Sequence, residues 1–503
     1  MSVAAAEGIQ FPADESRRRS TTAVSQAVVA EALATLDPAA ADRARTESDW
    51  RRGYRTHFAA TVTGAVAAGG SAASTLAKAG LDALHERFVF VRGDQVCSAP
   101  VALTQADDTH RLHTGTVRGT QGRVATLRVP YGGQVLEGDA LRRQIDRWVE
   151  GAIMEPSAAQ ALHRVLDRPE WLDLRDQQFV LLGAAAELAP LQTLAHLGAN
   201  LVAVDLDRPH VWRRLLATVR DSAGRLTFPL RRQLREGSTD EEIVEAAGAD
   251  LLSMTPEITD WLRELPGPFC VGAYGYLHGR DHVRLEVAMD ALMDALSQHR
   301  PDHSLAFLLT PSDVYAVPTE VAQVARSCYA REGARRPWRA GLRTLTGGRL
   351  YAPNVAQDLP SADGTACALY DGIVPAQGPN YALAKHIQRW RALAALAKGV
   401  RVSVNVAPST TTASVVSRRE FAAAFAGASH YGVEVFAPAT SNALMAALLV
   451  HDLRAERPPP PADHTAFADQ AVHGGMWRMA VQLRSVIEIA ALRGMLNRPT
   501  QAT

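Results

Sequence analysis

Two residues in the C-terminal third of the chain have the types and the spacing that acid–base chemistry requires. Tyr381 and Lys385 lie four residues apart in the segment YALAK, which opens a predicted helix running to about Lys398. Residues four apart lie on one face of a helix, so both side chains can address the same point. A neighbouring ammonium group favours phenolate, and this makes the phenol a proton donor or acceptor suited to alcohol–carbonyl interconversion. We therefore expect Tyr381 to be the acid/base and Lys385 to lower its pKa.

Further polar residues lie next to strands that are predicted on either side of this helix. An apolar strand over residues 400–406 ends in a hydroxyl-rich loop, Pro408 to Thr412. A strand-like run over residues 365–370 ends at Asp371, which could accept a hydrogen bond from a substrate hydroxyl. Ser312 follows another strand, predicted over residues 304–310, and is a second candidate for contact with the substrate. The alternative role for Ser312 is that of a turn or helix-cap residue.

The segment from Phe179 to Arg208 has the pattern of a unit that grips a dinucleotide. Two apolar runs, residues 179–182 and 201–204, indicate parallel strands that are covered on both faces. Gly183 follows the first strand, and the segment between the strands has about the length of a crossover helix. Asp205 closes the second strand, where its carboxylate can accept hydrogen bonds from a ribose diol. NAD is the expected cofactor. NADP remains an alternative, because Arg208 lies nearby and an arginine at such a position can bind the 2′-phosphate of NADP.

In this order the segments resemble the short-chain dehydrogenase/reductase family, whose members bind NAD(P) on a Rossmann fold. The resemblance rests on the glycine turn, the acid closing the second strand, the YxxxK helix and a strand ending in N-x-A-P with threonines, and it covers about residues 176–450. It implies that Tyr381 transfers the proton, and that Lys385 lowers the Tyr381 pKa and holds the nicotinamide ribose. The positions that it assigns to the cofactor are Gly183, Asp205, Gly272, Pro408, Thr410 and Thr411.

Two positions depart from the pattern of that family. Glu187 stands in place of the second glycine of the phosphate turn, and a carboxylate beside a pyrophosphate is repelled by ~1 kcal/mol at ~4 Å even in water. Either Glu187 turns away, or the cofactor binds differently or not at all. The serine that the family places shortly before the tyrosine would fall at Ala368. Asp371 and Ser312 are the two candidates to replace it.

Composition and charge exclude several classes of function. The chain has 503 residues, 47% of them apolar, with 53 basic and 53 acidic residues, so it can bury a core and has no net charge to attract nucleic acid. Its four cysteines are far apart, so neither a metal site nor a disulfide framework is predicted. No apolar run is long enough to span a membrane. We expect a soluble cytoplasmic protein that acts on a small molecule.

The alternation of predicted strands and helices indicates an α/β protein with a doubly wound, Rossmann-like parallel sheet. We expect this domain over residues 176–455, with an insertion at about 317–362. Residues 1–175 are predicted to form a loose arm to about residue 20, then helices over 21–36, 38–67 and 71–87, and a small α+β region. A proline linker over residues 456–464 leads to a terminal helix pair, 465–496, that could join two subunits. Short strands are also expected at 249–253 and 433–436.

Two other functions fit the same sheet. One is a nucleotide-binding scaffold or sensor without redox activity, which Glu187 and the missing serine favour. The other is a methyltransferase, in which Asp205 would hold the ribose of S-adenosylmethionine and the YxxxK spacing would be coincidental. The leading hypothesis is an NAD(P)-dependent oxidoreductase that interconverts an alcohol and a ketone.

Overall fold

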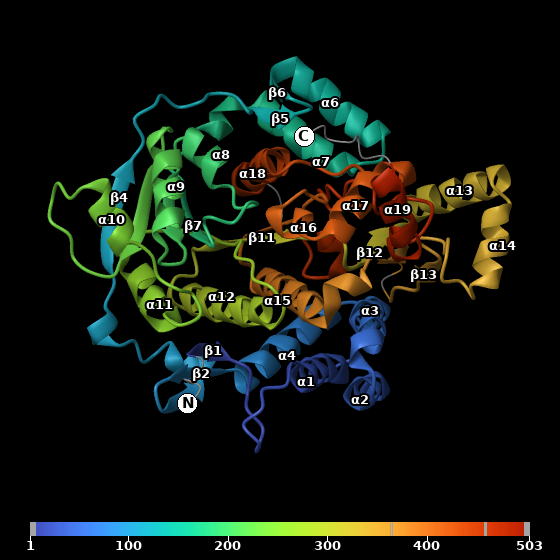
Figure 1. Cartoon of the computed structure of the whole chain (residues 1–503), viewed down its shortest axis with the longest axis horizontal. Helices are drawn as coiled ribbons and strands as arrows, with labels where there is room; N and C mark the ends of the chain where they lie inside the picture. Colours follow the sequence, from blue (N-terminus) through green and yellow to red (C-terminus); the bar gives the residue numbers. More distant parts are fainter. Residues whose placement is uncertain (1–6, 363, 365, 457–459, 497–503) are drawn as a thin grey trace.

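A seven-stranded sheet forms the centre of the molecule (Figure 1). The computed structural model describes residues 7–362, 364, 366–456 and 460–496. The strands of the central sheet are β4 (His113–Arg118), β7 (Gln178–Leu182), β8 (Asn200–Val204), β9 (Arg225–Leu230), β10 (Cys270–Ala273), β11 (Ser304–Leu309) and β15 (Val402–Val406). Six strands are parallel in the order β9-β8-β7-β10-β11-β15, and β4 pairs antiparallel with β9 at one edge. The order therefore reverses between the neighbours β7 and β10. The expected α/β class with a mostly parallel sheet is confirmed.

Apolar cores cover both faces of the sheet, because successive side chains of a strand point to opposite faces. Val180 and Leu182 belong to one core, whereas Phe179 and Leu181 belong to the other. The first core includes α11 (Thr255–Glu264), α12 (Arg280–His299) and α15 (Gly378–Ala397). The second includes α6 (Gly138–Glu150), α7 (Pro156–Asp167), α8 (Leu191–His196), α9 (Pro209–Arg220), α10 (Asp240–Ala246) and α18 (Pro438–Arg454). The continuous apolar sequence of the parallel strands is explained by this double burial.

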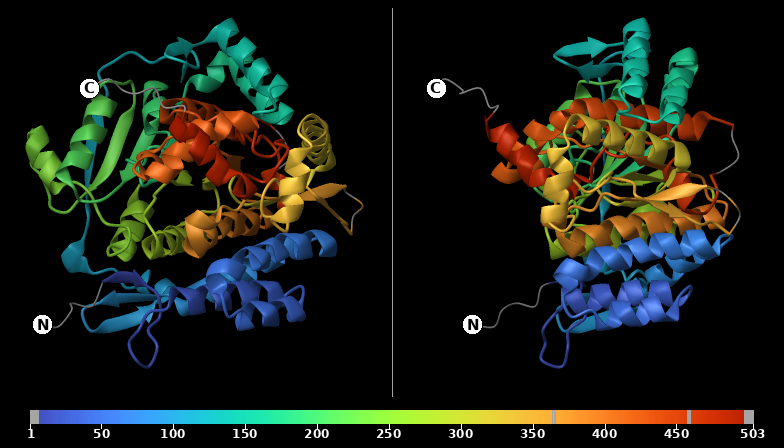
Figure 2. Two further views of the ribbon diagram at one scale, coloured as in Figure 1. Left: turned by 45° about the vertical axis from the view of Figure 1, so that its right-hand side comes forward. Right: turned by 90° about the vertical axis from the view of Figure 1, so that its right-hand side faces the viewer.

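The N-terminal helices form a further layer outside α12 and α15 (Figures 1 and 2). They are α1 (Thr21–Ala34), α2 (Pro38–Thr46), α3 (Trp50–Ala68) and α4 (Ala72–Arg87). The single helix expected over residues 38–67 is in fact two, because the backbone becomes extended at Glu47. α4 packs on α15 where Gly80 meets the indole of Trp390, and a Cβ atom on Gly80 would lie 2.6 Å from that ring. The N-terminal layer thus packs against the side of α15 that faces away from the central sheet.

Two expectations for the N-terminal region are wrong. The expected loose arm contains a strand, β1 (Gly8–Gln10), which pairs with β2 (Val89–Arg92); β2 in turn pairs with β3 (Gln95–Ser98). The strand β4 was expected in a separate small region, but it joins the central sheet beside β9. Its partner lies much later in the chain, and local sequence carries no signal for that pairing. α5 (Ala99–Ala102) lies between β3 and β4, and a hairpin of β5 (Val129–Tyr131) and β6 (Gln134–Leu136) follows β4.

An insertion separates β11 from α15. It contains β12 (Val314–Pro318), α13 (Thr319–Arg335), α14 (Trp338–Leu345), β13 (Gln357–Leu359) and β14 (Cys367–Asp371). The three strands form an antiparallel sheet of their own in the order β12-β14-β13. The run that ends at Asp371 is therefore not a strand of the central sheet, and the insertion is longer than the expected residues 317–362. It begins directly after the turn that contains Ser312.

Three short elements near the C-terminus and the middle of the chain also differ from expectation. Residues 251–253 form turns instead of a strand, and residues 433–436 contribute only the bridge between Thr410 and Phe436. The expected terminal helix pair is mostly irregular, because positive φ angles at Gln470, Gly474 and Gly475 interrupt it. Its remaining helix, α19 (Ile487–Leu496), packs on α17 (Arg419–Ala428), which follows α16 (Ala413–Val416).

Residues 457–459 of the proline linker lie outside the described residues. Within the described ranges, no helix is long and apolar enough to cross a membrane.

Candidate functional site

Two candidate residues, Ser312 and Tyr381, are linked through Thr310 just after the carboxyl end of β11. Thr310 Oγ1 and Ser312 Oγ are 2.9 Å apart in the turn after β11. Tyr381, in the first turns of α15, shares a hydrogen bond with Thr310. Gln377 Nε2, just before α15, donates to Ser312 Oγ at 2.9 Å. The structure thus brings Ser312 to Tyr381 although the insertion separates them in the sequence.

Lys385 lies one turn further along α15 and is linked to a buried carboxyl group. Lys385 Nζ donates to Gln388 Oε1 at 3.0 Å and to the carbonyl of Leu308 at 3.5 Å. Gln388 Nε2 in turn donates to Glu286 Oε1 at 2.8 Å, from α12. Burial lowers the pKa of Lys385, although the charge of Glu286 opposes this. Burial likewise raises the pKa of Glu286, and the charge of Lys385 opposes this shift.

The expected effect of Lys385 on Tyr381 is not found. Burial raises the pKa of Tyr381 well above its ordinary value, and the hydrogen bond from Thr310 opposes this only in part. The ammonium group of Lys385 is directed to Gln388 and Leu308, so desolvation of the phenol is the larger effect. Tyr381 is therefore a neutral phenol at neutral pH, and it can donate a proton or a hydrogen bond.

His282 lies beside Tyr381 and was not singled out by sequence analysis. It is in the first turn of α12, with its ring centroid 5.9 Å from that of Tyr381 and 4.8 Å from that of Tyr276. The residue is 2% exposed, and neither ring nitrogen has a hydrogen-bond partner in the described part of the chain. Burial lowers the pKa of His282 well below its ordinary value, so the ring is neutral. The i,i+4 spacing of His282 and Glu286 is the signal that could have found this residue.

The other candidate for the serine position, Asp371, lies in the antiparallel sheet of the insertion. Asp371 forms an ion pair with Arg484, at 2.8 Å between Oδ2 and Nη1, and accepts from the backbone N–H of Ile373. Ala368, where the family serine would fall, is buried in β14, where it pairs with Val317. Asp371 pairs with Val314, close to Ser312 in the chain, and its expected contact with the substrate stays a prediction. Ser312 is linked to Tyr381 through Thr310.

The glycine turn after β7 lies where the strand order reverses. Gly183 has a φ angle of +83°, which glycine adopts without strain. A Cβ atom on Gly183 would lie 2.5 Å from the backbone nitrogen of Gly275, so the loops after β7 and β10 touch directly. Gly272 is similarly confined, because its Cβ atom would lie 2.7 Å from a ring carbon of Tyr274. The helix that follows the turn is short and begins only at Leu191.

Asp205 and Glu187 both bind backbone groups of the chain itself. The Asp205 carboxylate accepts from the N–H groups of Ala185 at 2.7 Å and Leu206 at 2.8 Å. Burial raises the pKa of Asp205, and these two bonds oppose the shift. Asp205 therefore caps the β7 turn, a role that sequence analysis did not foresee. Glu187 points toward α16 and accepts from the N–H of Ala413 at 2.7 Å.

The hydroxyl groups of the loop after β15 are also engaged. Thr410 Oγ1 lies 2.7 Å from Ser441 Oγ of α18 and donates to the carbonyl of Pro408 at 2.9 Å. Thr411 Oγ1 donates to the carbonyl of Phe436 at 3.3 Å. This loop is thereby fixed to α18 and to the segment before it. Its expected contact with a cofactor stays a prediction.

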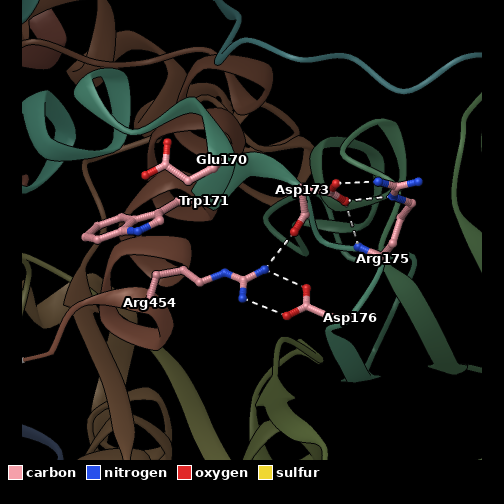
Figure 3. A pocket seen from close by; sticks show the side chains of 6 residues that line it. All are labelled: Glu170, Trp171, Asp173, Arg175, Asp176 and Arg454. Carbon is pink, nitrogen blue, oxygen red and sulfur yellow. Dashed lines mark hydrogen bonds and ion pairs between the residues drawn. The ribbon is translucent and has the colours of Figure 1, made fainter.

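A surface hollow of about 660 Å³ lies near the amino end of β7, away from Tyr381 (Figure 3). Arg454 forms a bidentate ion pair with Asp176 there, at 2.6 and 2.7 Å. Arg175 pairs with Asp173 at 2.6 Å, so the charged groups at the centre of this hollow are matched. In residues 7–362, 364, 366–456 and 460–496, no cluster of His, Cys, Asp and Glu is placed to hold a metal ion.

No protein-family model, curated protein or solved structure matches this chain. Its function therefore has to be inferred from the residues themselves.

Proposed function

We propose that the protein is an NAD(P)-dependent oxidoreductase that interconverts an alcohol and a ketone at Tyr381. The link from Ser312 through Thr310 to Tyr381, with Lys385 one turn further along α15, supports this proposal most. The strand order also supports it. The order β9-β8-β7-β10-β11-β15 is the one expected of a doubly wound dinucleotide-binding sheet, in which ligands bind at the carboxyl ends where the order reverses.

The residues around Tyr381 fit the reactive end of a nicotinamide dinucleotide. His282 has no hydrogen-bond partner at either ring nitrogen, and Gln377 Oε1 has none, within the described residues. Native proteins leave few buried polar atoms without partners, so these atoms are candidates for contact with a bound ligand. With the cofactor bound, Asp205 would lie at the ribose, and Pro408, Thr410 and Thr411 would lie on the far side. The bound nicotinamide would accept or return a hydride.

The protein residues would handle the proton. In carbonyl reduction the neutral phenol of Tyr381 donates its proton to the substrate oxygen, and the Ser312 hydroxyl donates a hydrogen bond to the same oxygen. An ammonium group on Lys385, one turn further along α15, would stabilise the phenolate that remains. Burial raises the pKa of Tyr381, so the phenol is protonated at neutral pH, which is the state that donates a proton to a ketone oxygen.

Ligand titration tests the proposal directly. The purified protein is titrated with NADH, NADPH and S-adenosylmethionine while its melting temperature and tryptophan fluorescence are recorded. A saturable shift with either nicotinamide cofactor is expected. A shift with S-adenosylmethionine alone would indicate a methyltransferase. The absence of a shift with NADH and NADPH would refute the proposed function, and would favour a scaffold or sensor.

Replacement of Tyr381 by Phe should abolish turnover and leave cofactor binding intact. Loss of a positioned acid/base reduces the rate by about 10²–10⁴-fold. The matched control is Tyr54→Phe, because Tyr54 is also buried and its hydroxyl has no hydrogen-bond partner among the described residues. Rates are measured as NADH consumption with a panel of ketones. A Tyr381→Phe enzyme as active as Tyr54→Phe would remove Tyr381 from the reaction.

A further inference from the structure

His282 is a buried side chain beside the proposed reaction centre, and neither of its ring nitrogens has a hydrogen-bond partner among the described residues. A buried polar side chain without a hydrogen bond is costly, and native proteins avoid such groups unless a ligand or water fills the gap. The imidazole lies beside the rings of Tyr276 and Tyr381, and Glu286 Oε1 lies 4.0 Å from its Nδ1, beyond hydrogen-bond distance. It is thus a direct neighbour of the phenol that would transfer the proton.

The charges around Tyr381 cancel in pairs. Lys385 and Glu286, a basic and an acidic side chain, are joined through Gln388. Asp313 follows Ser312 and pairs with the buried Arg389 at 3.0 Å. A ligand with a carboxylate or an ammonium group would therefore find no unmatched counter-charge among these groups, and a buried unpaired charge is costly. The site suits a neutral ligand.

The unpaired polar atoms indicate which hydrogen-bonding groups that ligand carries. A neutral imidazole presents one N–H donor and one acceptor nitrogen, and Gln377 Oε1 presents an acceptor. A hydroxyl group is both donor and acceptor, so it matches the imidazole. We propose that the substrate is a neutral polyhydroxylated alcohol, or its ketone, in which a second hydroxyl near the reacting carbon binds His282 while the reacting oxygen lies at Tyr381 and Ser312. This inference rests on the proposed function.

A matched pair of substrates tests the inference in the unmodified protein. Cyclohexane-1,2-diol and cyclohexanol differ by one hydroxyl group, and both are assayed for NAD⁺-dependent oxidation. Because the second hydroxyl would fill the bonds that His282 lacks, kcat/KM for the diol should exceed that for cyclohexanol by about tenfold or more. In the His282→Phe variant this ratio should fall toward one, and His282→Gln, which keeps a donor and an acceptor, should recover part of it.

A binding measurement provides a readout that does not depend on turnover. The ring nitrogen signals of His282 are assigned in ¹⁵N-labelled protein by comparison with His282→Phe, and the diol is then added with NADH present. The diol should shift these signals, whereas cyclohexanol at the same concentration should not.

The possible results separate the two proposals. If neither NAD nor NADP binds, the proposed function fails and this inference fails with it. If the cofactor binds but cyclohexanol is oxidised as well as the diol, or if the diol leaves the His282 signals unchanged, the inference alone is refuted.

Discussion

Gly183 holds two loops in contact at the residue where the strand order reverses. Its φ angle is +83°, and the position that a Cβ atom would take lies 2.5 Å from the backbone nitrogen of Gly275. Gly183→Ala should therefore lower the free energy of unfolding by about 2–4 kcal/mol, from backbone strain and from overlap with backbone atoms that cannot rotate away.

Gly279 is the matched control for that substitution. It has a φ angle of +61°, but nothing lies within 4 Å of its Cβ position. Gly279→Ala should cost only the backbone strain, about 1–3 kcal/mol, because its ψ angle of −129° lies outside the left-handed helical region. Urea unfolding of the two variants measures both values. Equal losses would show that contact with Gly275 contributes nothing.

At the same scale, residue spacing predicted part of the candidate site. Tyr381 and Lys385 share a helix, so their proximity could be read from the four-residue spacing. Ser312 was one of two candidates, because the sequence did not show that the strand before Asp371 belongs to the insertion. The direction of the Tyr381 pKa shift was missed, since burial of a phenol depends on α12, which is distant in the sequence. The cap that Asp205 forms was missed for the same reason.

Among the elements, the parallel strands were the most predictable. Their apolar runs reflect burial on both faces, a local property that each strand shows by itself. The partner of β4 was not predictable, because a half-buried strand fits any open sheet edge. The C-terminal segment has helical apolar spacing around Met476 and Met479, but the glycines at 474 and 475 turn the backbone so that these side chains fill the core without a helix.

The contact between α17 and α19 depends on glycine. A Cβ atom on Gly427 would overlap the carbonyl oxygen of Ala490, and a backbone oxygen has no rotamer by which to give way. Gly427→Ala should lower the free energy of unfolding by about 1–3 kcal/mol through overpacking. By contrast, Gly341 in α14 has open space around its Cβ position, so Gly341→Ala should raise it by about 0.5–1 kcal/mol. Thermal melting distinguishes the signs; stabilisation by Gly427→Ala would contradict the close packing.

The whole molecule contains several buried histidines, and these make its stability depend on pH. Burial lowers the pKa of His386 to about 4, opposed by the charge of Asp313, and it also lowers the pKa of His303 to about 4. The unfolded chain binds these protons below about pH 6.5, whereas the folded chain does not until about pH 4. The stability that these histidines contribute is present above pH 6.5 and is lost as the pH falls toward 4.

The expected loss for His386 alone is about 3 kcal/mol between those two pH values. Urea unfolding at pH 7, 6, 5 and 4 measures it, and the midpoint should decrease at each step. Burial tends to raise the pKa of Glu155, but the hydrogen bonds from His473 and Arg478 outweigh it and lower the pKa to about 2. Glu155 therefore adds to the loss of stability only in stronger acid. Equal midpoints at pH 7 and pH 5 would show that the buried histidines accept protons in the folded protein.

The order in which the ribosome releases the chain gives the α4–α15 contact a biosynthetic consequence. α4 leaves the ribosome early, but the face of α15 that covers it is made on the order of 300 residues later, which is roughly 15–60 s at the usual rate of translation. During that interval the apolar side of α4 around Gly80 has no partner from α15. This face of α4 is therefore open to chaperones until α15 is made, and the site at Tyr381 cannot assemble before then.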